Sequence, residues 1–102
     1  MLKHYICKPN EADTETSIVT VAENYELAVV SMRITGGTTG GDVNFIVYRG
    51  GNKMIDIKMS IAANDTVLID SKDFYEAGDT LKMKASAVGM AIELSADYSP
   101  VA

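Results

Sequence analysis

The chain contains few of the residues from which catalytic and metal sites are built. Its 102 residues include one cysteine, one histidine and no tryptophan, and nine lysines and arginines stand against fourteen aspartates and glutamates. One cysteine excludes an intramolecular disulfide and a cysteine-based zinc site. The formal net charge of −5 argues against nucleic acid and anionic membranes as partners, because both are bound through clustered basic residues.

Long apolar runs are also missing. No segment approaches the ~18 consecutive apolar residues of a membrane span, and Met1–Tyr5 carry no signal-peptide pattern. We therefore expect folding in a reducing cytoplasm. The length suits one domain over residues 1–102, with residues 1–15 as an N-terminal arm, and 47% hydrophobic residues are enough for a core without disulfide bonds.

What the chain does contain is alternation of apolar and polar residues, which is typical of strands with one wet face. Turn signals separate about eight such segments, and no helix of about ten or more residues is convincing. The expected strands are residues 4–8, 16–22, 25–35, 42–49, 53–61, 67–69, 80–87 and 90–96. The pattern predicts an all-β fold, a single antiparallel β-sandwich and, by strand number, a jelly roll.

The longest expected strand, Tyr25–Thr35, also contains good helix formers, so a helix is the competing interpretation. Its β-branched pairs favour a strand, with even-numbered residues 28–34 on one face and odd-numbered residues 27–33 on the other. In residues 53–61 we expect the odd-numbered apolar residues to face the core. Residues 71–76, with Phe74-Tyr75, are expected as a short connection.

One turn sequence occurs twice. Residues 63–67 and 77–81 share the pattern Ala-[Asn/Gly]-Asp-Thr-aliphatic, and each opens an alternating run. Asn64 and Gly78 tolerate the positive φ of a tight reversal. The Asp that follows is expected to accept a hydrogen bond from nearby backbone N–H groups. The pattern therefore predicts two hairpin-like turns and no active site.

Three features of the chain are candidate sites by residue type. His4 is the single histidine, and the chain has no Gly-x-Ser-x-Gly motif that would supply a serine nucleophile for it. Cys7 is expected as a buried thiol on an N-terminal strand. Gly36–Gly41 is not followed by Gly-Lys-[Ser/Thr] and a helix, so it predicts a flexible loop that orders against a neighbouring subunit, and no phosphate site. We assign no catalytic, cofactor-binding or metal-binding residue, and we expect no enzyme and no cofactor.

Two further groups leave alternatives open. Crowded carboxylates are expected in solvated turns, with loop-bound calcium as the alternative; they are Asp65, Asp70, Asp73, Glu76 and Asp79. Aromatic residues are expected in the core or at an interface, with a shallow sugar platform as the alternative; they are Tyr25, Tyr48, Phe74, Tyr75 and Tyr98.

The second half of the chain carries a longer pattern, which lies in residues 60–70, 75–86 and 92–95. This pattern resembles that of small structural proteins of tailed-bacteriophage virions, which have an aliphatic residue, Pro-Ala-Gly and an aliphatic run, and then Leu-Glu-Ala-Gly-Asp-x-Leu-Lys-Val-Lys-Ala-Ser. This chain has Ala62 in place of the proline and Asn64 in place of the first glycine.

The resemblance implies a β-sandwich or jelly-roll protein of capsid decoration or of a tail or fibre. It implies a homo-oligomer that contacts phage capsid or tail proteins, a virion location, and synthesis in the host bacterial cytoplasm. Capsid decoration is the first expectation and a tail or fibre component the second. A β-sandwich carbohydrate-binding module is the alternative of another class. An acidic surface agrees with a part that lies outside packaged DNA.

Overall fold

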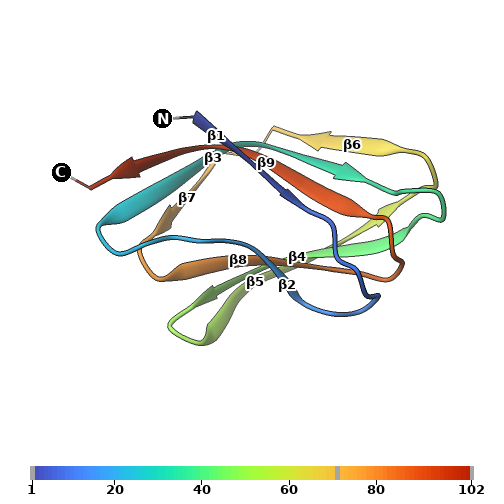
Figure 1. Cartoon of the computed structure of the whole chain (residues 1–102), viewed down its shortest axis with the longest axis horizontal. Coiled ribbons are helices and arrows are strands. Elements are labelled where there is room, and N and C mark those ends of the chain that lie inside the picture. The colour runs from blue at the N-terminus through green and yellow to red at the C-terminus, as the bar shows by residue number, and fades with distance from the viewer. Residues whose placement is uncertain (1, 71, 102) are drawn as a thin grey trace.

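The computed structural model describes residues 2–70 and 72–101, which form two antiparallel sheets packed face to face (Figure 1). The predicted all-β sandwich is confirmed. The strands are β1 (Leu2–Cys7), β2 (Thr16–Thr20), β3 (Tyr25–Thr35), β4 (Gly41–Arg49), β5 (Asn52–Ile61), β6 (Thr66–Ile69), β7 (Asp73–Glu76), β8 (Asp79–Ala85) and β9 (Ala91–Pro100).

The strand pairing is nested. Sheet I has the order β1-β9-β3-β6, with β7 also beside β3, and sheet II has the order β2-β8-β4-β5. The first strand therefore pairs with the last, the second with the one before it, β3 with β6 and β7, and β4 with β5. All these pairs are antiparallel.

The core lies between the two sheets and follows from strict alternation. In β8, Leu81 and Met83 are fully buried, while the residues that alternate with them are only half-buried, namely Thr80, Lys82 and Lys84. Ile92 and Leu94 of β9 face them from the other sheet and are also fully buried. Each such side chain contributes about 1.5–3 kcal/mol relative to an exposed one, so the alternation predicted from sequence stabilises the sandwich.

The strand over Tyr25–Thr35 has the predicted bounds, but its predicted faces are wrong. Leu27 and Val29 are buried in the first half, whereas Met32 and Ile34 are buried in the second half. A β-bulge between Val29 and Ser31 shifts the register against β9. The extra residue of a bulge reverses which side chains face the core, so neither parity describes the whole strand.

Two other segments differ from expectation. Residues 73–76 are strand β7 rather than a connection, and β7 pairs with β3 so that Tyr75 is buried and Phe74 exposed. Asp-Phe-Tyr-Glu places two aromatic residues side by side between two acidic ones, so it lacks the alternation that predicts a strand. Ser71, with which the expected connection begins, lies outside the described residues. The first half of the expected N-terminal arm is not free either, because Leu2–Cys7 is hydrogen-bonded to β9.

The Gly36–Gly41 loop is packed against the turn that follows β5. The N–H of Gly36 donates to the carbonyl of Asp65 at 2.9 Å, and the N–H of Asn64 donates to the carbonyl of Gly37 at 2.6 Å. A Cβ at Gly36 would collide with the carbonyl oxygen of Ala62. The glycines thus allow a close backbone approach within the chain itself.

Candidate functional site

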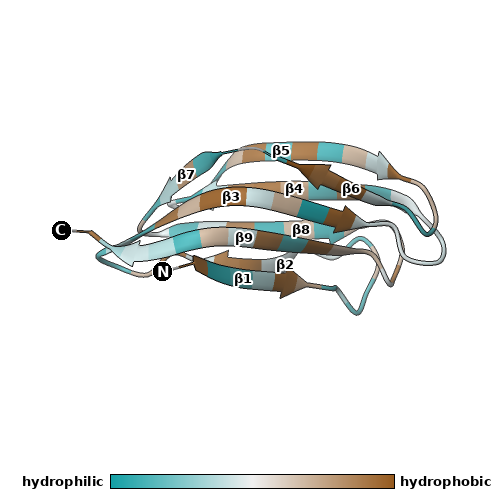
Figure 2. Cartoon of the chain, turned by 90° about the horizontal axis from the view of Figure 1, so that it is seen from above, coloured by the Kyte–Doolittle hydropathy of each residue, from teal (hydrophilic) through white to brown (hydrophobic). Residues whose placement is uncertain are grey.

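The two long sides of the sandwich differ (Figure 2). On one side β1 of sheet I lies against β2 of sheet II; on the other, β5 is the edge of sheet II while β6 and β7 form the edge of sheet I. The strands of this second side border an apolar cavity of about 80 Å³. Its lining residues are Val29, Met32, Phe45, Ile55, Ile57, Met59, Ile69, Asp73 and Tyr75. We call this side the open side.

Exposed apolar side chains occur on both long sides of the sandwich. On β1, Leu2 and Ile6 are 68% and 70% exposed. On the open side, Met54 and Ile57 of β5 are 47% and 52% exposed. Leu68 of β6 and Phe74 of β7 are 66% and 64% exposed on the outer face of sheet I, next to the cavity-lining Ile69 and Tyr75. Ile57 lines the cavity, which agrees with the face that the alternation predicts. Because β5 is an edge strand, the Ile57 side chain is still about half exposed. Edge strands with apolar side chains are where another chain can pair.

The polar groups of the cavity are Asp73 and Tyr75. The Tyr75 hydroxyl donates to Asp73 Oδ2 at 3.5 Å, and the Tyr75 side chain is 3% exposed. Burial, reinforced by the nearby Asp73 carboxylate, raises the pKa of the Tyr75 phenol well above its usual range. The phenol therefore stays protonated, and here it acts as a hydrogen-bond donor inside an apolar wall.

The outer face of sheet II, by contrast, is polar and internally paired. Asn44 Nδ2 donates to Asp56 Oδ1 at 2.8 Å, and Lys53 Nζ lies 3.3 Å from Asp56 Oδ2. These contacts, led by the Asn44 hydrogen bond, lower the pKa of Asp56. Lys58 Nζ lies 3.6 Å from Asp42 Oδ2, and its side chain is 66% exposed.

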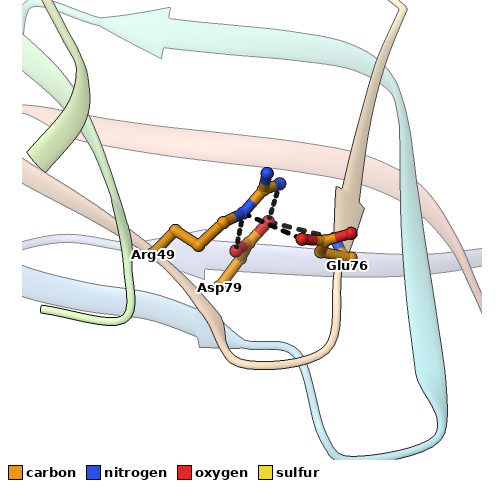
Figure 3. Close-up of polar contacts among 3 residues, drawn as sticks. All are labelled: Arg49, Glu76 and Asp79. Atoms are coloured by element: carbon orange, nitrogen blue, oxygen red, sulfur yellow. Dashed lines mark hydrogen bonds and ion pairs between the residues drawn. The ribbon is translucent and has the colours of Figure 1, made fainter. Parts of the chain in front are cut away.

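An ion pair between a buried carboxylate and a partly exposed arginine lies at the second of the two repeated turns (Figure 3). The Asp79 side chain is fully buried, and Arg49 Nε and Nη2 donate to its two oxygens at 2.7 and 2.8 Å. The N–H of Glu76 donates to Asp79 Oδ2 at 3.0 Å, and the Glu76 carboxylate lies 3.2 Å from Arg49 Nε. Both Asp79 oxygens are therefore used in holding the start of β8 to the end of β4, which is a structural role.

The crowded carboxylates do not converge. Asp79 and Glu76 contact Arg49, Asp73 lines the open-side cavity, and the Asp65 side chain accepts from the N–H of Thr66 at 2.9 Å. Among the residues that the structure describes, no group of three or more His, Cys, Asp or Glu side chains is placed to hold a metal ion.

His4 and Cys7 lie on opposite faces of β1. His4 Nε2 is 2.9 Å from Glu93 Oε1 and 3.3 Å from Ser95 Oγ on the exposed face. Cys7 is 6% exposed, and its thiol donates to the carbonyl of Ser17 at 3.8 Å. Burial raises the pKa of the Cys7 thiol, which makes it less reactive. The prediction of a buried thiol on an N-terminal strand is confirmed.

The five tyrosines do not form a row on one sheet face. Tyr75 is buried, Tyr5 is half-buried in β1, and the Tyr48 hydroxyl donates to Glu15 at 2.8 Å. Tyr25 and Tyr98 are in ring contact, with ring centroids 5.0 Å apart and planes tilted by 33°.

The open side was not predicted from the sequence. Lysine is common on edge strands, but it does not single out β5 here. β5 carries Lys53 and Lys58, while β8, which lies between β2 and β4, carries Lys82 and Lys84 in the same kind of alternation. No protein-family model, no curated protein and no solved structure matches this chain. The described residues contain no helix with the length and apolarity that a membrane crossing requires.

Proposed function

We propose that the protein is a structural building block of a tailed-bacteriophage virion, with capsid decoration as its role. The observation that carries the proposal is the open side: an apolar cavity bordered by a long edge strand with exposed apolar side chains. Such a surface is stabilised when another protein covers it. The protein would be made in the host cytoplasm and would act in the virion as an oligomer.

The nested pairing supports the jelly-roll interpretation. A jelly roll consists of two sheets of antiparallel strands joined as Greek keys, and pairing the first strand with the last, inward to a central hairpin, produces that arrangement. The order β1-β9-β3-β6 opposite β2-β8-β4-β5 follows this rule throughout. A sandwich with this strand pairing is consistent with the rigid body that a capsid or tail component needs.

A tail or fibre component remains the second candidate, since the same surface serves either location. The carbohydrate-binding alternative has one observation in its favour, the Tyr25–Tyr98 pair beside Lys3, whose Nζ lies 5.3 Å from the centre of the Tyr98 ring. A sugar platform of one tyrosine pair is small, because Tyr98 is itself half-buried and its hydroxyl accepts from the N–H of Ala22 at 2.8 Å.

The experiment is to look for the chain in virions. Particles purified from a phage or induced prophage that encodes this sequence are analysed by mass spectrometry and by electron microscopy with a labelled antibody. We expect the chain in stoichiometric amounts on the capsid surface; label on the tail would move the role to the second candidate. Particles that lack the chain would overturn the proposal, and binding to a glycan array would favour the carbohydrate module.

A further inference from the structure

We propose that two copies of this chain join through β5, edge to edge and antiparallel, about a two-fold axis at Ile57. The inference rests on the proposed building-block function and identifies a contact through which two copies of the chain assemble. It arises from the strand Asn52–Ile61 and from its place at the open side. The occupant of this edge is a second copy of the same chain.

Of the four sheet edges, β5 offers the longest free strand. It has ten residues, whereas β2 has five and the opposite edge of sheet I is divided between β6 and β7 with four residues each. The remaining edge, β1, lies against β2. A long edge strand presents a row of backbone N–H and C=O groups to a partner, and only β5 combines that length with exposed Met54 and Ile57.

The sequence of β5 is complementary to itself around Ile57. In an antiparallel pair centred there, Asp56 lies opposite Lys58 of the second copy, and Lys58 lies opposite its Asp56. Ile55 lies opposite Met59 in the same way, and Ile57 lies opposite itself. Directly opposite side chains of antiparallel strands interact, so the pairing places opposite charges together on the outer face and apolar side chains together on the cavity face.

Other registers lack this match. A two-fold centred on Asp56 puts two aspartates directly opposite each other, and one centred on Lys58 does the same with two lysines. Like charges in that position destabilise a sheet. A one-residue slip sets the apolar face of one strand against the charged face of the other. Register is therefore specified by the side chains between Ile55 and Met59.

The charged groups have partners within the chain but keep the capacity to make this contact as well. The Lys58 side chain is 66% exposed, and its distance of 3.6 Å to Asp42 is that of a loose ion pair. Asp56 accepts from Asn44 and lies near Lys53, but a carboxylate has about four acceptor positions. The pairing also covers Ile57, which is 52% exposed in the single chain. Because a two-fold pair uses each β5 edge once, this contact closes at a dimer.

Disulfide trapping tests the register. Directly opposite residues have Cα atoms about 4.5–5.5 Å apart, which lies within the range that a disulfide spans. The I57C variant is expected to form a covalent dimer in air, at least about tenfold faster than the S60C variant, since Ser60 of the two copies lie far apart in this pairing. Both positions are on the same strand, and native Cys7 is buried in each variant.

Charge exchange tests the pairing without cysteines. The D56K and K58D variants each place like charges opposite one another, and we expect each to weaken the dimer by about tenfold in analytical ultracentrifugation. The double variant D56K/K58D restores opposite charges and is expected to restore the dimer. K8D makes the same change of charge as K58D at a residue outside the strands, and it is the control for that variant.

The outcomes separate this inference from the proposed function. An oligomer in which I57C crosslinks no faster than S60C would overturn the β5 pairing and leave the building-block function standing. A chain that stays monomeric at millimolar concentration would also overturn the pairing, and its presence or absence in virions would then decide the function separately.

Discussion

The two repeated turns have nearly the same sequence and the same local shape but different surroundings. Asn64 and Gly78 adopt positive φ values of 59° and 91°, and the Asp after each accepts a backbone N–H. The Asp65 side chain is exposed, whereas the Asp79 side chain is fully buried. Local sequence thus determines the shape of each turn, whereas contacts with distant parts of the chain determine how much the turn contributes to the stability of the fold.

Each turn has its own tertiary anchor. The first is held by the Gly36–Gly41 loop, through main-chain hydrogen bonds from Gly36 and Asn64. The second is held by two main-chain hydrogen bonds with Val21 and, in addition, by the guanidinium of Arg49, which lies 30 residues from Asp79 in sequence. The contacts of the first turn require that Gly36 has no side chain, whereas the charged contact of the second turn requires the carboxylate of Asp79.

The Asp79→Ala variant is expected to have the largest effect. It removes both hydrogen bonds of Arg49 and the acceptor of the Glu76 N–H, and leaves that N–H unpaired. We expect a loss of about 3 kcal/mol in the free energy of unfolding, or a decrease of roughly 10–25 °C in melting temperature by calorimetry. The matched control is Glu76→Ala, which keeps the backbone N–H and removes only a carboxylate that is 64% exposed, so we expect little change. An equal effect of the two variants would contradict the role assigned to Asp79.

The Gly36→Ala variant tests the first anchor. The added methyl group meets the carbonyl oxygen of Ala62, and backbone must move to accept it. We expect a loss of about 2 kcal/mol in chemical denaturation. Gly50→Ala is the comparison, because a Cβ there has nothing within 4 Å and only the positive φ of 58° opposes it. Gly36 has no positive φ, so a loss in Gly36→Ala no larger than that in Gly50→Ala would contradict the role assigned to its close packing.

Acid should weaken the second anchor. The Arg49 hydrogen bond lowers the pKa of Asp79 in the folded state. The ionised carboxylate therefore stabilises the fold above the unfolded-state pKa of about 3.9, and this contribution is lost as the pH falls through the folded-state pKa. Urea unfolding of the native chain should show stability decreasing below about pH 4. Asp79→Asn should make that decrease shallower; Asp56, whose pKa is also lowered, accounts for part of the remainder. An unchanged slope would argue against the Asp79–Arg49 pair as its source.

The Asp65→Ala variant is expected to have the smallest effect. The exposed Asp65 side chain makes a local hydrogen bond to Thr66, so its removal should cost about 0.5–1 kcal/mol. Thermal unfolding of the variant beside Asp79→Ala measures the difference between the two turns directly. A loss as large as that of Asp79→Ala would show that exposure does not distinguish them.

Much of the fold was predictable because its signals are local. Alternation located eight of the nine strands, and the turn residues Asn64 and Gly78 marked their own conformations. The bulge after Val29 was not predictable, since it depends on the partner strand β9. The Arg49–Asp79 pair joins residues that no sequence pattern connects.

The candidate site was predicted less well than the fold. Alternation correctly predicted the face of the sheet on which Ile57 lies. The exposure of Ile57 depends on whether another strand covers it, and periodicity does not predict the order of strands in a sheet. Tyr75 shows the converse: in a segment expected to be a connection, it is buried through the pairing of β7 with β3. Edges and the surfaces beside them are properties of the assembled sheets.

The nested pairing has a consequence for how the chain folds. β4 and β5 are joined by a two-residue turn at Gly50-Gly51, while the outermost pair brings Leu2 opposite Asp97. Each successive pair closes a longer loop, and contacts between residues distant in sequence slow folding to about milliseconds to seconds. The central hairpin can form early, and β1 can dock only after β9 is in place. β9 lies between β1 and β3, so sheet I lacks this strand until residues 91–100 have been synthesised, and β1 has no partner strand before then.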